Sequence, residues 1–77
     1  MGANYSEAEA LAQVLRSKFS YTIVVDEYFD FRNKYYLSLN AEFGSELDFA
    51  KFLPTGWVYN EWENKDQRAW MTTVEKL

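Results

Sequence analysis

The spacing of the apolar residues changes near residue 20, from a helical period to a period of two. Over residues 6–19 the apolar side chains fall on one helical stripe. Ser6 precedes this stripe and Glu9 follows three residues later, which is the pattern of a capping box. We therefore expect a helix over residues 6–19 that begins at Ser6. Its buried face should hold Ala8, Leu11, Ala12, Leu15 and Phe19.

Residues 20–43 alternate apolar and other residues, which predicts a β-hairpin. The polar break between its strands is Arg32-Asn33-Lys34, and asparagine tolerates the left-handed conformation of a turn. Glu27 interrupts the apolar parity and marks either a bulge or the point where the strand leaves the core. The residues expected to face the core are Tyr21, Ile23, Val25, Phe29 and Phe31 on the first strand, and Tyr35, Leu37, Leu39, Ala41 and Phe43 on the second.

The second half of the chain repeats the order of a helix followed by a hairpin. A short helix should begin at Ser45 and end before Pro54 and Gly56. Its apolar residues, which include Phe49 and Phe52, are so closely spaced that most of this helix should be covered. Residues 57–63 and 68–76 then predict two strands, with 64–67 as the turn.

The whole chain, residues 1–77, is expected to form a single domain of the α+β class. The elements follow the order α-β-β-α-β-β, and sequential hairpins give an antiparallel four-stranded sheet with two helices packed on one face. Hydrophobic residues make up 48% of the chain and aromatic residues 19%, which is far from the composition of a disordered segment.

The composition argues against most catalytic chemistry, because the chain contains neither histidine nor cysteine. These two residues supply the usual general base, thiolate nucleophile and soft metal ligand. Asp26, Glu27 and Asp30 lie close together but lack the spacing of a calcium loop. We therefore expect a protein that is not an enzyme, with no cofactor and no metal.

The location and the partners are also constrained by composition. A small secreted domain usually needs disulfides, so the absence of cysteine favours the cytoplasm. The N-terminus has no signal-peptide pattern, and no apolar run approaches the ~20 residues of a membrane span. The net charge is −4 and no basic stripe is present, which disfavours direct binding of nucleic acid. A partner protein with a basic surface fits better, and a nucleic-acid-binding protein would be one such partner.

Folding the first hairpin about Asn33 places several acids and tyrosines on one face. Asp26, Tyr28 and Asp30 then lie on the face opposite to the aliphatic core, with Tyr36 and Glu42 on the neighbouring strand. The predicted pairs are Asp26 with Asn40, Tyr28 with Ser38 and Asp30 with Tyr36. This face is interpreted either as a docking surface for a basic partner or as an ordinary solvated sheet face.

Glu61, Trp62 and Glu63 continue this pattern on the third strand. If Trp57 and Tyr59 face the core, Trp62 is either turned by a bulge or exposed. We therefore add Glu61 and Trp62 to the candidate partner-binding residues, which are Asp26, Tyr28, Asp30, Tyr36, Glu42, Glu61 and Trp62.

Three hypotheses for function follow from these features. The first is a small acidic protein that binds and modulates another protein, most simply as an inhibitor. In size, acidity and lack of cysteine the chain resembles phage-encoded inhibitors of bacterial defence systems, some of which imitate the charge of DNA. No motif carries this resemblance. The second hypothesis is a self-associating structural module such as a homodimer, and the third is an aromatic platform that binds carbohydrate or single-stranded nucleic acid.

Overall fold

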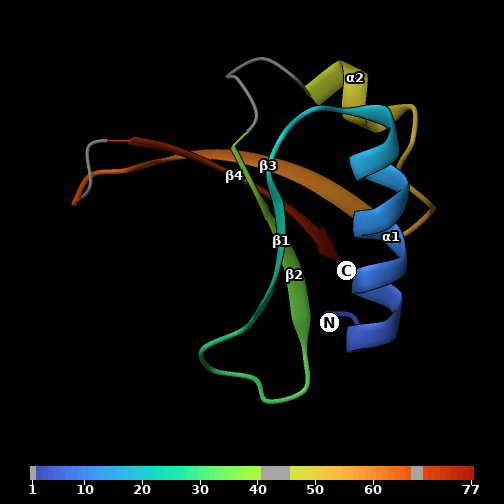
Figure 1. The fold of residues 1–77 in the computed structure, drawn as a ribbon. Coiled ribbons are helices and arrows are strands. Elements are labelled where there is room, and N and C mark those ends of the chain that lie inside the picture. Colours follow the sequence, from blue (N-terminus) through green and yellow to red (C-terminus); the bar gives the residue numbers. More distant parts are fainter. Residues whose placement is uncertain (1, 41–45, 67–68) are drawn as a thin grey trace.

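The computed structural model describes residues 2–40, 46–66 and 69–77 of the chain. Its elements are α1 (Tyr5–Lys18), β1 (Ile23–Glu27), β2 (Tyr35–Leu39), α2 (Glu46–Ala50), β3 (Trp57–Asn64) and β4 (Ala69–Lys76). The strands form one antiparallel sheet in the order β1-β2-β4-β3. Helix α1 packs on β1 and β2, and α2 packs on β3 (Figure 1). The predicted α+β fold and its order of elements are confirmed.

Helix α1 begins at Tyr5, and its N-cap lies two residues earlier than predicted, at Asn4 instead of Ser6. The Oδ1 atom of Asn4 accepts a hydrogen bond from the Glu7 backbone N–H at 2.8 Å, and the Glu7 carboxylate accepts one from the Asn4 N–H at 3.5 Å. Asn4 and Glu7 thus form the capping box. Both pairs have the right spacing, but Glu9 forms an ion pair with Arg16 instead. The predicted buried face is confirmed at Ala8, Leu11, Ala12 and Leu15, and Phe19 packs against it.

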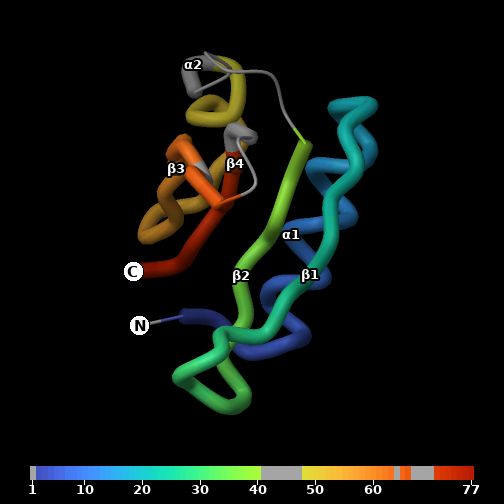
Figure 2. The backbone as a smooth tube through the Cα atoms, turned by 90° about the vertical axis from the view of Figure 1, so that its left-hand side faces the viewer, coloured from blue at the N-terminus to red at the C-terminus, as the bar shows by residue number. Residues whose placement is uncertain are grey.

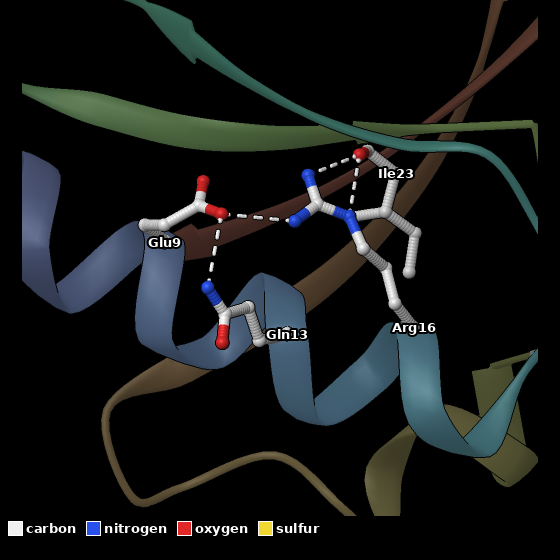
Figure 3. A network of polar contacts seen from close by, with 4 residues as sticks. All are labelled: Glu9, Gln13, Arg16 and Ile23. Atoms are coloured by element: carbon white, nitrogen blue, oxygen red, sulfur yellow. Dashed lines mark hydrogen bonds and ion pairs between the residues drawn. The ribbon is translucent and has the colours of Figure 1, made fainter.

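A single guanidinium group ties α1 to the edge strand β1 (Figure 3). Arg16 donates from Nε and Nη2 to the Ile23 carbonyl oxygen at 3.1 and 2.7 Å, and from Nη1 to Glu9 Oε1 at 3.0 Å. Gln13 donates to the same Glu9 oxygen at 3.5 Å. Arg16 therefore fixes the last turn of α1 against the start of β1 and occupies a carbonyl at the sheet edge.

Helix α2 is attached to the core by one aromatic side chain. Phe49 is completely buried and stacks on Phe19 and Tyr59, with ring centroids 4.4 and 4.9 Å away. The prediction that this segment is covered is confirmed at Phe49 and Leu53, but Ala50 and Phe52 are exposed. A helix of five residues has a single turn, and one turn directs few side chains to the core. The predicted start at Ser45 lies outside the described residues.

The first hairpin is shorter than predicted and has a different register. Val24 lies opposite Ser38 and Asp26 lies opposite Tyr36, in place of the predicted partner Asn40. Strand β1 ends at Glu27, which confirms that the strand leaves the core there. Residues 28–34 form a loop that begins with a hydrogen bond from Tyr28 N to Lys34 O at 2.9 Å.

The loop over residues 28–34 overturns the predicted placement of two phenylalanines. Phe29 is fully exposed and Phe31 is 53% exposed, whereas their parity with Val25 predicted burial. The parity ceases to apply because the extended backbone stops at Glu27, whose carboxylate accepts a hydrogen bond from Asn33 N at 3.0 Å. Asn33 adopts a φ of 64°, as predicted for the turn.

The second hairpin is regular and encloses the core together with α1. Pairing between β3 and β4 runs without a break from Trp57↔Lys76 to Asn64↔Ala69. The buried residues Leu37, Val74 and Tyr59 lie side by side across the sheet and face the helices. Gly2 N donates to Lys76 O at 2.9 Å, and Figure 2 shows the two chain ends side by side. None of the described helices combines the length and the apolar character needed to cross a bilayer.

Candidate functional site

The sheet face that is turned away from α1, called the outer face below, contains a hollow of about 710 Å³. Figure 1 shows that the 28–34 loop and the β3–β4 hairpin both extend on the side of the sheet opposite α1. Aromatic side chains make up much of the lining, and the thioether of Met71 adds to its apolar surface. The aromatic residues at the hollow are Tyr28, Phe29, Phe31, Tyr36 and Trp62.

The floor of the hollow is low because short side chains meet at the middle of the sheet. Ser38 on β2 pairs with Thr73 on β4, and Thr73 in turn pairs with Asn60 on β3. Longer side chains surround this row, since Asp26 lies opposite Tyr36 on one side and Trp62 lies opposite Met71 on the other. A row of small residues between large ones therefore produces the hollow.

Glu75 is the polar centre of the outer face. Its Oε1 atom accepts a hydrogen bond from the Tyr28 hydroxyl at 2.6 Å, and its Oε2 atom accepts one from the Asn60 side-chain amide at 2.7 Å. Glu75 lies on β4, Asn60 on β3 and Tyr28 directly after β1, so the two bonds cross most of the sheet. The carboxylate is thereby held in one orientation by two neutral donors.

Two tyrosines beside Glu75 are kept in the neutral form. Burial raises the pKa of Tyr28, and the hydrogen bond to Glu75 and the charge of Glu75 raise it further. Burial also raises the pKa of Tyr36, with added effects of the Asp26 and Glu75 charges. The two rings contact each other, with centroids 4.8 Å apart. At neutral pH both hydroxyl groups therefore keep their protons, and Tyr28 donates its proton to Glu75.

Three large aromatic side chains at the hollow remain exposed to solvent. Phe29 is 101% exposed, Phe31 is 53% exposed and Trp62 is 45% exposed. The alternatives for Trp62 are thereby decided, because β3 has no bulge and Trp62 lies on the outer face. Exposed aromatic side chains that gather around one hollow are typical of an interaction surface.

Three carboxylates at this face, those of Asp26, Asp30 and Glu75, form no ion pair with the described residues. The ion pairs among the described residues join Glu9 to Arg16 and Glu7 to Lys76, and both involve α1. Asp30 and Glu75 border the hollow, and Asp26 lies beside it on the same face. The hollow is thus acidic as well as aromatic.

The structure brings together most of the candidate residues that the sequence predicted. Tyr28, Asp30, Tyr36 and Trp62 border the hollow, and Asp26 is adjacent. Glu61 also borders it, but Glu61 pairs with Thr72, whose buried hydroxyl donates to Leu39 O on the core side. Strand alternation therefore directs the Glu61 side chain away from the outer face. Glu42 lies outside the described residues.

Sequence reasoning missed Glu75, Asn60 and the two loop phenylalanines. The position of Glu75 depends on β4 being the inner neighbour of β2, which no local pattern indicates. A signal was available for Phe29 and Phe31, because Glu27 ended the apolar alternation just before them.

The described residues offer no other obvious chemistry at this site. Within residues 2–40, 46–66 and 69–77, no three potential ligand side chains are grouped so that they could hold a metal ion. No family model, curated protein or solved structure matches the chain. The outer face is therefore the feature of the molecule that bears on its function.

Proposed function

We propose that this protein binds a basic surface of another protein through its outer face and inhibits that partner by covering the surface. The observation that carries this proposal is the hollow of about 710 Å³, around which exposed aromatic rings gather together with the carboxylates of Asp26, Asp30 and Glu75. A solvated sheet face would gain nothing from exposing Phe29, Phe31 and Trp62 together.

The two kinds of residue at the hollow would contribute in different ways. Each aromatic side chain can bury about 150–250 Å² against a partner, and this burial provides affinity. The carboxylates of Asp26, Asp30 and Glu75 would pair with arginine or lysine and direct the encounter. The net charge of −4 acts in the same sense at long range.

The proposal also includes the mode of action, which is inhibition, and the location in the cell. A domain of 77 residues that covers a basic surface denies that surface to nucleic acid or to other acidic partners. The resemblance in size, acidity and composition to phage-encoded inhibitors of bacterial defence systems supports this mode of action. The absence of cysteine fits action in the cytoplasm.

Binding of a carbohydrate is the second candidate, and the size of the hollow favours it. Its volume lies within the roughly 300–1,000 Å³ that small-molecule sites occupy, and exposed rings can stack on sugars. Single-stranded nucleic acid is disfavoured, because Asp26, Asp30 and Glu75 would repel its phosphates. The same charges oppose pairing of this face with a second copy of itself.

Differential capture from a bacterial lysate tests the proposal. The wild-type chain would be compared with Asp26→Lys/Asp30→Lys on the outer face and with Asp48→Lys/Glu63→Lys outside the hollow. Both variants change the net charge equally, and Asp48 and Glu63 are exposed. We expect the wild type and the control variant to retain the same protein and the outer-face variant to lose it. Retention by all three chains, with circular dichroism showing them folded, would refute the proposal.

A further inference from the structure

We propose that the hollow is a receptor for an arginine side chain of the partner, and that Glu75 receives its guanidinium group. This inference rests on the proposed function and deepens it, because it names the group that anchors the partner. It also predicts that lysine cannot replace arginine, which attraction between opposite charges alone would not require.

The geometry of Glu75 suits a guanidinium group. Each carboxylate oxygen already accepts one hydrogen bond, from Tyr28 at 2.6 Å and from Asn60 at 2.7 Å, and each oxygen has a second lone pair. Both donors are neutral, so the charge of the carboxylate is not cancelled. Two parallel N–H groups of arginine can reach both oxygens at once, whereas an ammonium group acts as a point charge. Because the carboxylate is held beforehand, binding costs little side-chain entropy.

The aromatic surroundings favour the same occupant. The Tyr28 and Tyr36 rings lie together beside Glu75, Phe31 meets Tyr28 edge-on at 6.3 Å, and Trp62 borders the hollow. A guanidinium plane stacks on such rings and is weakly hydrated, whereas an ammonium group loses strong hydration on entry. The hollow is thus suited to a cation that is flat and tolerates contact with apolar groups.

The neighbouring acids complete the charge complementarity. Asp26 is opposite Tyr36, and Asp30 borders the hollow from the 28–34 loop. They would attract any cationic segment without distinguishing arginine from lysine. Selectivity is therefore assigned to Glu75 and general attraction to Asp26 and Asp30, and the two roles can be separated by experiment.

The test uses two matched peptides, one of alternating glycine and arginine and one of alternating glycine and lysine, of equal length. Each is titrated into the ¹⁵N-labelled full chain, and the Asn60 side-chain amide and the Trp62 indole are followed by NMR. We expect the arginine peptide to bind roughly fivefold or more tightly than the lysine peptide and to shift both signals. Glu75→Gln should lower the ratio, because only stacking on the aromatic rings then favours arginine, whereas the control Glu63→Gln, outside the hollow, should leave the ratio unchanged.

Asp26→Asn/Asp30→Asn separates this inference from the proposed function. These substitutions should weaken both peptides equally and preserve the preference for arginine. Equal binding of the two peptides to the wild type, or no shift at Asn60, would overturn the arginine site. The proposed function would survive that result if charge reversal at Asp26 and Asp30 still abolished partner capture. If Glu75→Gln failed to fold, Tyr28→Phe would replace it. Tyr28→Phe keeps the charge of Glu75 and removes one of the two donors that position its carboxylate. An unchanged preference for arginine in Tyr28→Phe would also contradict the inference.

Discussion

Replacing Tyr28 by phenylalanine removes the hydroxyl group that reaches from the end of β1, across β2, to the Glu75 carboxylate on β4. The hydrogen bond is short, at 2.6 Å, and its acceptor is a carboxylate. Hydrogen bonds to charged groups contribute about 1.5–3 kcal/mol to stability. Tyr28 is only partly buried, so water replaces some of the lost bond. We therefore expect Tyr28→Phe to lower the free energy of unfolding by about 1–2 kcal/mol, which corresponds to roughly 4–8 °C in Tm per kcal/mol for a domain of this size.

A double-mutant cycle isolates the bond between Tyr28 and Glu75. The variants are Tyr28→Phe, Glu75→Ala and the double substitution, and the loss of the Asn60 bond is common to both chains that lack Glu75. We expect a coupling free energy of about 1–2 kcal/mol at neutral pH. The total stability of 77 residues should be about 4–12 kcal/mol, so each variant remains folded.

Urea denaturation followed by circular dichroism provides the measurement, with the slope m compared among the four chains. An unchanged m shows that the substitutions act on stability and not on the extent of unfolding. A coupling free energy below about 0.3 kcal/mol would mean that Tyr28 does not hold Glu75 in solution. The inference that the Glu75 carboxylate is preorganised, on which the arginine site depends, would then be wrong.

Three further predictions concern the cap of α1, the core and the two tyrosines beside Glu75. Asn4→Ala should lower the free energy of unfolding by about 1 kcal/mol and Ser6→Ala by much less, since Asn4 caps α1; urea denaturation of both variants checks this. Phe49→Ala should cost about 3–5 kcal/mol, because a fully buried ring stacked between two others is lost, and an effect under about 1 kcal/mol would contradict its role. Stability should fall as the pH rises above about 10, because the pKa values of Tyr28 and Tyr36 are raised in the folded chain and these tyrosines ionise first in the unfolded chain. Urea midpoints from neutral to alkaline pH measure this decline, and Tyr28→Phe should flatten it.

The sequence predicted the elements better than their ends because periodicity is a property of many residues. The stripe from Ala8 to Leu15 defined the buried face of α1, whichever residue capped it. The cap itself depended on one choice between Asn4 and Ser6, which have equivalent spacing to a glutamate. Glu9 instead pairs with Arg16 within the same helix, and Arg16 is held there by the Ile23 carbonyl of β1, a contact that depends on how α1 packs on the sheet.

The outer face was predicted correctly in part although the register was wrong. Pairing Asp26 with Tyr36 instead of Asn40 shifts the second strand by four residues, which is an even number. An even shift leaves every side chain on its own face, because strands alternate with a period of two. Asp26 and Tyr36 therefore stay on the outer face, while residues 28–34 leave the strand altogether.

The central acid of the hollow depends on strand order, which is the level of structure that this sequence specifies least. With β4 inside and β3 at the edge, Glu75 comes within reach of Tyr28 across β2, and Asn60 reaches it from the other side. If β3 were the inner strand, Asn60 would lie nearer to β2 and Glu75 would move to the edge. The hairpin pairing alone is compatible with either order. The site therefore depends on how the two hairpins pair in the sheet. Glu75→Ala removes contacts that join the hairpins, so it tests this pairing as well as the binding of a partner.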